Sequence, residues 1–242
     1  MIPARVDAYD QDKAAAALAG DGAVVLTGLA PTPDAPVVAA ALVLGQRLRE
    51  LFPVRERGSR DGGPVHLHAD SFDVVVDIGG VPHRRRHPDE DHVLVQCVRP
   101  PTAGGDSFTV DAYEAVRSFD PDLVAFLTNV DVDLYGAWAG LRGLPATPTV
   151  ARHVEYTRTG RRIVRRTGGA APLHRDPRAE HVSGMLARFE QAVHALEPDL
   201  PRYPLTEGDI LLLDNYRCWH GRDPHEGDRL VRILTLRTED AR

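Results

Sequence analysis

Near its carboxyl end the 242-residue chain reads Gly208-Asp209-Ile210-Leu211-Leu212-Leu213-Asp214-Asn215-Tyr216-Arg217-Cys218-Trp219-His220-Gly221-Arg222. Residues 208–214 form a short, apolar run, which is typical of a buried strand. A turn-rich segment that carries His220 separates them from a second apolar run at residues 229–236. The stretch therefore predicts two short strands with a histidine between them.

Toward the amino terminus the chain offers more short strand patterns than long helical ones. We expect strands at residues 23–27, 72–78, 93–98, 107–110, 130–135, 150–157 and 161–167. We expect helices at residues 11–18, 37–51, 111–119, 121–127 and 177–196. This balance predicts a mainly β (α+β) fold, an antiparallel sandwich or barrel with helices packed outside it. Our choice is a double-stranded β-helix, a cupin-like jelly roll with flanking helices.

Composition indicates a compact globular protein. Apolar residues make up 43% and charged residues 26% of the chain, and no repeat or linker divides it, so one domain over residues 1–242 is expected. A formal charge of -6 makes nucleic acid an unexpected partner. The longest apolar run, residues 35–44, is far below the roughly 20 residues of a membrane span, and no signal peptide is recognisable. We expect a cytoplasmic monomer or homodimer with reduced, core-type thiols at Cys97 and Cys218.

Two polar segments interrupt these patterns. Residues 56–64 are polar and glycine-rich, which favours a mobile loop. Residues 83–92 are very polar and include Arg84-Arg85-Arg86, so we expect a surface excursion there. The arginines could steer an anionic substrate, but a solvated charge run is the commoner explanation.

The sequence His68-Ala69-Asp70 follows the first polar segment and suggests a metal site. Side chains two residues apart point to the same face of an extended strand, so both could converge on one ion. Two histidines and one carboxylate are the facial triad of non-haem iron(II) oxygenases, which leaves positions open for other ligands. A third ligand must come from elsewhere, and the short motif is weak evidence by itself.

The carboxyl-terminal segment supplies the missing context. Its apolar strand, Asp214-Asn215, His220-Gly221-Arg222 and later arginines closely resemble the distal half of the iron site in the TauD/TfdA (taurine dioxygenase-like, clavaminate synthase-like) family. His68-Ala69-Asp70, the strand ending at residues 94–97, the segment at residues 104–107 and residues 21–28 resemble the same family, so the likeness covers most of the chain.

This resemblance implies a complete iron and co-substrate site. His68, Asp70 and His220 would bind iron(II), and 2-oxoglutarate and dioxygen would be co-substrates. Arg232 would pair with the distal carboxylate of 2-oxoglutarate, because a guanidinium binds a carboxylate through two parallel hydrogen bonds.

Ser107 would donate a hydrogen bond to the same carboxylate. Family members usually space the two arginines four apart, whereas Arg229 and Arg232 are three apart and would face opposite sides of a strand. Which of them binds the co-substrate stays open.

The resemblance also implies a reaction. The default is hydroxylation of an unactivated C–H bond in a small metabolite, such as an amino acid or a natural-product intermediate, with release of succinate and carbon dioxide. Desaturation, epoxidation or cyclisation would use the same iron chemistry. Family halogenases have a small residue at the position of Asp70, so Asp70 argues against halogenation. A departure from the family is the long excursion between Phe72 and Leu94, which we interpret as a lid or substrate-selecting loop.

Two other classes of function are compatible with these residues. A cupin-like lyase or hydrolase could use the same ligands with zinc or manganese, and it would turn over without oxygen. A binding or regulatory protein could keep the fold without chemistry, although a metal site with all its co-substrate groups would then be hard to explain.

Residues beside the motifs have structural interpretations as well. We expect His66 to line the site or contact a ligand rather than bind metal. Asp214 and Asn215 more often cap a turn through their side-chain acceptors. Tyr216 and Trp219 are at least as often core residues as pocket residues.

Overall fold

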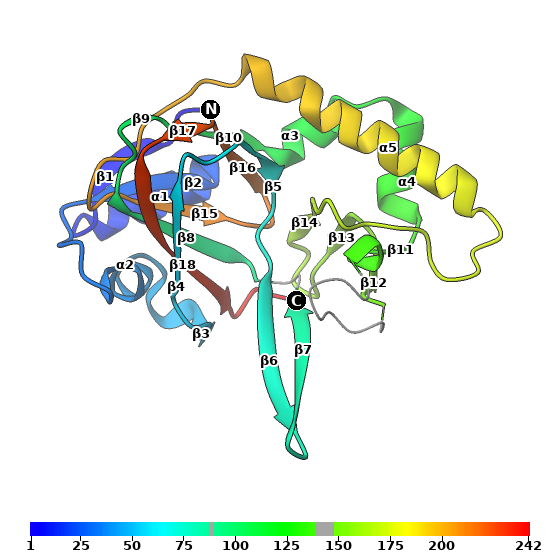
Figure 1. Cartoon of the computed structure of the whole chain (residues 1–242), viewed down its shortest axis with the longest axis horizontal. Coiled ribbons are helices and arrows are strands. Elements are labelled where there is room, and N and C mark those ends of the chain that lie inside the picture. Colours follow the sequence, from blue (N-terminus) through cyan, green and yellow to red (C-terminus); the bar gives the residue numbers. More distant parts are fainter. Residues whose placement is uncertain (88–89, 139–147) are drawn as a thin grey trace.

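The computed structural model describes residues 1–87, 90–138 and 148–242, and it is a sheet-dominated mixed α and β structure (Figure 1). A large sheet and a smaller sheet carry the fold, and helices cover the outer side of each. Among the described residues, no helix is long and apolar enough to cross a membrane.

The large sheet contains seven strands. Its order is β1-β2-β15-β8-β18-β3, and β4 pairs with β18 as well. The pair β1–β2 is parallel and the remaining pairs are antiparallel. The strands are β1 Ala4–Asp7, β2 Ala23–Thr27, β3 Leu48–Leu51, β4 Arg55–Arg60, β8 His92–Arg99, β15 Ile210–Asp214 and β18 Asp228–Thr238.

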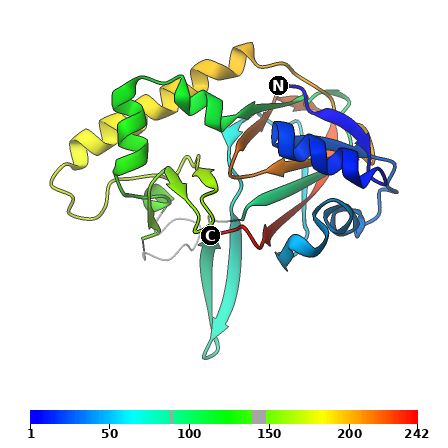
Figure 2. The same ribbon diagram turned by 180° about the vertical axis from the view of Figure 1, so that it is seen from behind.

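Successive side chains of each strand point to opposite faces of this sheet, so a separate cluster of buried residues packs on each face. Val24 and Leu26 pack with buried residues of α1 (Gln11–Asp21) and α2 (Ala35–Leu44), whereas Ala23 and Val25 belong to a separate cluster on the other face. Figure 2, seen from behind, places α1 and α2 in front of the large sheet. The cluster on the inner face includes Cys218, which comes from the smaller sheet.

The smaller sheet has the order β10-β16-β5, formed by Ser107–Asp111, Cys218–Arg222 and Val65–His68. Its apolar side chains pack with α3 (Ala112–Arg117), α4 (Pro121–Asn129) and α5 (Ala179–Leu196). Asp111 and Asp120 begin α3 and α4, because their carboxylates accept hydrogen bonds from the first free amides of each helix.

The remaining strands form short ladders. They are β9 Ala103–Gly104 with β17 His225–Glu226, β11 Val132–Asp133 with β12 Val150–Ala151, and β13 Val154–Tyr156 with β14 Arg162–Val164. Three 3-10 turns complete the described elements: η1 Gly45–Arg47, η2 Gly136–Trp138 and η3 Glu197–Asp199. Among the described strands, β6 (Phe72–Ile78) and β7 (Val81–His87) pair with each other alone, and they form a hairpin that projects from the body (Figure 1).

Two expectations about the amino-terminal half are wrong. The helix expected at residues 37–51 ends at Leu44, because Gly45 has a positive φ of 52° and the chain then enters η1 and β3. Residues 56–64 are not a loop throughout, because β4 pairs with Asp228–Ile233 of β18. A polar strand forms there because the long β18 presents backbone groups that need hydrogen-bond partners.

Further differences concern the middle of the chain. The surface excursion expected at residues 83–92 takes the form of strand β7, within the projecting hairpin (Figure 1), and the start of β8, and the side chains of Arg84–Arg86 lie outside the described part. The strands expected at residues 130–135, 150–157 and 161–167 are much shorter, since each pairs over only two or three positions. Cys97 and Cys218 are both buried and free, as expected.

Candidate active site

His68, Asp70 and His220 come together at one end of the smaller sheet. His68 closes β5 and faces His220 of β16 as its cross-strand partner, with ring centroids 4.4 Å apart. Asp70 follows two residues after His68, and its carboxylate oxygens lie 3.6 Å from His68 Nε2 and 3.7 Å from His220 Nε2. One ligand atom from each residue lies within 4.8 Å of the other two.

Burial shapes the charges in this cluster. Burial and the neighbouring positive charge of His68 lower the pKa of His220 to about 3. For Asp70, burial favours the neutral acid, but the hydrogen bond from His68 and the charges of His220, His68 and Arg55 hold its pKa well below the usual value. For His68, burial opposes protonation, yet the contact with Asp70 raises its pKa. The cluster therefore keeps its carboxylate ionised, which is the form that binds a cation.

The donor set fits iron(II). Two imidazoles and one carboxylate, converging from two strands, form the arrangement expected of a facial triad. The Oδ2 atom of Asp70 is buried, and among the described residues no hydrogen-bond donor satisfies it. A buried carboxylate oxygen without a donor is costly, and a bound cation would offset that cost.

Backbone contacts orient the first histidine. His68 Nδ1 lies 2.9 Å from the carbonyl oxygen of His66, so the Nε2 atom is the one turned toward Asp70. His66 was expected to line the site or contact a ligand. Its carbonyl does contact His68, but its side chain is bonded to Glu197 and is absent from the residues lining the cavity described next.

A cavity of about 120 Å³ opens beside the triad, between the two sheets. Val95, Leu211, Val231 and Ile233 line it from the large sheet. The residues that line it from the smaller sheet and its loops are Val65, His68, Asp70, Ser107, His220, Gly221 and Arg222. Arg229 completes the wall. The cavity therefore joins the triad to an apolar surface and to basic groups.

Arg229 and Arg232 have different surroundings, as their spacing suggested. Arg229 lines the cavity, and burial together with the positive charge of Arg222 lowers its pKa to about 10. Within the described part of the chain its side chain forms no ion pair. Arg232 is absent from the residues lining the cavity and instead bonds Glu56 and Gln96.

Ser107, the first residue of β10, lines the cavity. It is 6% exposed, and its backbone exchanges two hydrogen bonds with Tyr203. Ser107, Arg222 and Arg229 line the cavity together. The Asp223 carboxylate lies near Arg222, whereas the side chain of Arg229 forms no ion pair with any residue that the structure describes. An anionic group is the ligand that this part of the cavity favours.

Asn215 has a role that the sequence did not reveal. Its Oδ1 accepts a hydrogen bond from the Asp70 amide at 2.9 Å, and its Nδ2 donates to the carbonyl oxygens of Asp70 and Glu90. Turn chemistry alone predicted a local cap, whereas the partners lie far away in sequence. Only a motif-level comparison of the Asp-Asn pair with the histidine that follows could have suggested this contact.

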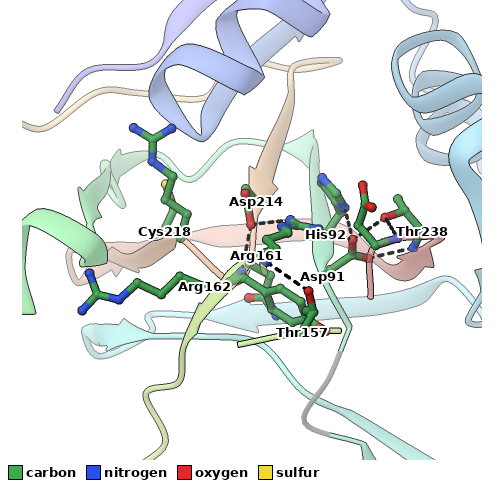
Figure 3. A network of polar contacts seen from close by, with 12 residues as sticks. Asp91, His92, Thr157, Arg161, Arg162, Asp214, Cys218 and Thr238 are labelled. Atoms are coloured by element: carbon green, nitrogen blue, oxygen red, sulfur yellow. Dashed lines mark hydrogen bonds and ion pairs between the residues drawn. The ribbon is translucent and has the colours of Figure 1, made fainter. Parts of the chain in front are cut away.

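A buried ionic network includes Asp91 and Asp214, next to Asn215 in space and in sequence (Figure 3). Arg161 donates to Asp91 at 2.6 Å and to Asp214 at 2.7 Å, and Asp91 also accepts from the amide of Thr238. The Asn215 amide donates to the carbonyl oxygen of Asp91. The network therefore ties the end of β15, the start of β8 and the end of β18 to the residue that holds Asp70.

The two aromatic residues of the motif belong to the core. Trp219 is fully buried, and its indole nitrogen donates to the Val164 carbonyl oxygen. Tyr216 is 1% exposed and lies under the guanidinium of Arg161. Neither lines the cavity. Gly221 lacks a side chain for a steric reason, since a Cβ there would collide with the Phe108 ring and the Val65 carbonyl oxygen.

Comparisons with known proteins agree with this geometry. A family model described as "Taurine catabolism dioxygenase TauD, TfdA family" matches residues 3–236. A search of curated proteins gave no match.

Solved structures share the fold at low sequence identity. A taurine dioxygenase from Burkholderia xenovorans is 16% identical, with a TM-score of 0.66 over 97% of this chain and 85% of that one. AAD-2, solved with Mn(II) and N-oxalylglycine, is 14% identical, with a TM-score of 0.66 over 96% and 91%. PvcB from Pseudomonas aeruginosa is 18% identical, with a TM-score of 0.59 over 93% and 79%. Because the family model spans nearly the whole sequence, the chain belongs to the TauD/TfdA family of iron(II)- and 2-oxoglutarate-dependent dioxygenases.

Proposed function

We propose that this dioxygenase hydroxylates an unactivated C–H bond of a small metabolite, such as an amino acid or a natural-product intermediate. The observation that carries the proposal is the cavity between the two sheets, which combines the triad, an apolar wall and Arg229, an arginine without an ion pair in the described part of the chain. Iron(II), 2-oxoglutarate and dioxygen would supply the oxidising power, with succinate and carbon dioxide as the products of the co-substrate.

We assign the iron to His68, Asp70 and His220. Their converging ligand atoms and the buried, undonated oxygen of Asp70 support this assignment. The presence of a carboxylate at residue 70 favours hydroxylation over halogenation, because all three protein ligands are then retained.

We assign the distal carboxylate of 2-oxoglutarate to Arg229, with Ser107 as a second donor. Both residues line the cavity, and burial strengthens the attraction of a guanidinium for a carboxylate. Arg232 is the weaker choice, because it does not line the cavity and its Nε and Nη1 atoms already donate to Glu56 and Gln96. The apolar wall of Val95, Leu211 and Ile233 would pack on the methylene groups of the co-substrate.

The expectations about the detailed fold type, the lid, the location and the oligomeric state stay predictions. Two sheets that enclose one cavity support the double-stranded β-helix as the detailed description of the fold. The β6–β7 hairpin begins directly after Asp70 and Ser71, a position that supports its role as a lid or substrate-selecting element. A cytoplasmic location, the monomer or homodimer and the absence of nucleic-acid and membrane partners rest on the sequence alone.

The test is anaerobic addition of iron(II) and 2-oxoglutarate to the apoprotein, followed by visible absorption spectroscopy. We expect the weak charge-transfer band of the chelate with the wild type, and its loss in His220→Ala and Arg229→Ala. A substrate screen by succinate release would then follow. Bound metal without the band, together with turnover in the absence of oxygen, would instead support a lyase or hydrolase that uses the same ligands.

A further inference from the structure

A second group of metal-binding side chains lies outside the candidate iron site. It consists of His66 from β5, His194 from the last turn of α5 and Glu197 from η3. His66 Nδ1 lies 2.9 Å from Glu197 Oε2, and the rings of His66 and His194 are 4.7 Å apart. One donor atom from each residue lies within 4.8 Å of the other two.

The local structure holds the carboxylate of this group in place. His194 and Glu197 are three residues apart where α5 runs into η3, so their side chains lie on the same side of the helical turn. Glu197 Oε1 accepts a hydrogen bond from the Leu67 amide at 2.8 Å. The side chain of Glu197 is 13% exposed, whereas that of His66 is 55% exposed. One ligand is therefore fixed and the imidazoles are accessible from solvent.

We propose that His66, His194 and Glu197 form a second cation site, for a zinc-like divalent transition metal. Imidazole nitrogen with one carboxylate oxygen suits zinc, copper or nickel, whereas calcium and magnesium prefer oxygen ligands only. Zinc bonds of about 2.0–2.2 Å place tetrahedral ligand atoms roughly 3.3 Å apart. The donor atoms lie within 4.8 Å of one another, and His66 Nδ1 and Glu197 Oε2 are already 2.9 Å apart, so rotation of the exposed histidine rings could bring the set to this geometry. Water would fill the fourth position.

A simpler account of the cluster is an ion pair between His66 and Glu197, with His194 beside it. In that account Glu197 only attaches the end of α5 to β5 through the Leu67 amide. The two accounts differ at His194, because its side chain is required for the metal site and dispensable for the ion pair. His194 is therefore the residue to change.

The outer site adjoins the inner one through a single residue. The His66 carbonyl accepts the hydrogen bond of His68 Nδ1, so the strand that would hold the outer cation also orients a proposed iron ligand. A cation bound by His66 would fix this strand against the end of α5. The outer site is nevertheless tested without iron, which separates its outcome from that of the proposed function.

The experiment is a calorimetric titration of the full-length, tag-free protein with Zn²⁺. The background variant is Asp70→Ala combined with His220→Ala, which removes two of the three proposed iron ligands and leaves β5 unchanged. We expect one equivalent of Zn²⁺ to bind this background and none to bind after His194→Gln is added. His181→Gln is the matched control, because His181 is an exposed histidine of the same helix and lies outside the cluster.

Two further measurements check that the variant folds and that the site prefers transition metals. Thermal unfolding checks that His194→Gln folds, and its exposed side chain leaves the core untouched. Titration with Mg²⁺ should give no binding at the Zn²⁺ concentrations used, whereas Co²⁺ should give visible d–d absorption that His194→Gln removes. No Zn²⁺ equivalent in the background variant, or an equivalent that survives His194→Gln, would overturn the proposal.

Discussion

Asn215 holds the backbone of Asp70 on both sides, with its Oδ1 on the Asp70 amide at 2.9 Å and its Nδ2 on the Asp70 carbonyl oxygen at 3.0 Å. This pair links the loop after β15 to the loop after β5, over a separation of 145 residues. The carboxylate of Asp70 is therefore oriented by a residue that does not line the cavity.

The first prediction concerns this contact. Asn215→Ala should weaken iron(II) affinity about 10- to 100-fold, the usual effect of removing a group that orients a metal ligand. Asn129→Ala is the control, because the Asn129 side chain donates within its own helix, to the Ala125 carbonyl oxygen. Anaerobic iron(II) titration is the measurement. Equal affinities in wild type and Asn215→Ala would show that the backbone of Asp70 needs no support.

The second prediction separates the two arginines. Arg229→Gln should raise the KM for 2-oxoglutarate roughly 10- to 150-fold, because a charge-assisted hydrogen bond contributes about 1.5–3 kcal/mol. Arg232→Gln should leave that KM nearly unchanged and lower the melting temperature, because Arg232 bonds Glu56 and Gln96. Succinate release at varied 2-oxoglutarate gives both values. The opposite pattern would transfer the co-substrate role to Arg232.

The third prediction concerns the buried network of Figure 3. Arg161→Ala should reduce the free energy of unfolding by about 3–5 kcal/mol, since it removes the guanidinium from the fully buried carboxylate of Asp91. Arg152→Ala removes an exposed pair with Asp131 and should cost about 1 kcal/mol or less. Urea denaturation measures both variants, and equal losses would contradict the importance of burial.

The fourth prediction is a pH dependence that follows from Asp91. Burial opposes ionisation, but His92, Thr238 and Arg161 hold the pKa of Asp91 below its usual value. A lowered pKa means that Asp91 stabilises the fold fully above its unfolded pKa, near 3.9, and that this stabilisation is lost as pH falls toward the folded-state pKa.

Asp91→Asn should therefore flatten the decline in stability below about pH 4. The measurement is urea unfolding of wild type and Asp91→Asn from neutral pH to about pH 3. Parallel curves for the two proteins would mean that other carboxylates cause the acid sensitivity.

The fifth prediction tests the glycine after His220. Gly221→Ala should destabilise the protein by about 1–3 kcal/mol, because its Cβ would lie 2.7 Å from the Val65 carbonyl oxygen and against the Phe108 ring. Gly184→Ala in α5 is the matched control, since nothing lies within 4 Å of its added Cβ. That control should stabilise the protein by up to about 1 kcal/mol. Thermal unfolding distinguishes the signs, and similar shifts would contradict the steric argument.

The amino-acid sequence by itself determined the features that depend on neighbouring residues. The apolar runs of β2, β8, β15 and β18 follow from local patterning, and the amphipathic spacing of α5 does too. The short motif at His68 and Asp70 and the segment around His220 carried the family resemblance, which the family model confirmed.

Tertiary structure decided what depends on partners far along the chain. Strand β4 is polar and gives no periodic signal, and it exists because β18 pairs with it. Alternation placed Arg229 and Arg232 on opposite faces, but only the packing of the smaller sheet on the larger one decided which face lines the cavity. The contact of Asn215 with Asp70 has the same origin. Such contacts form only when the chain folds back on itself, so no local pattern in the sequence encodes them.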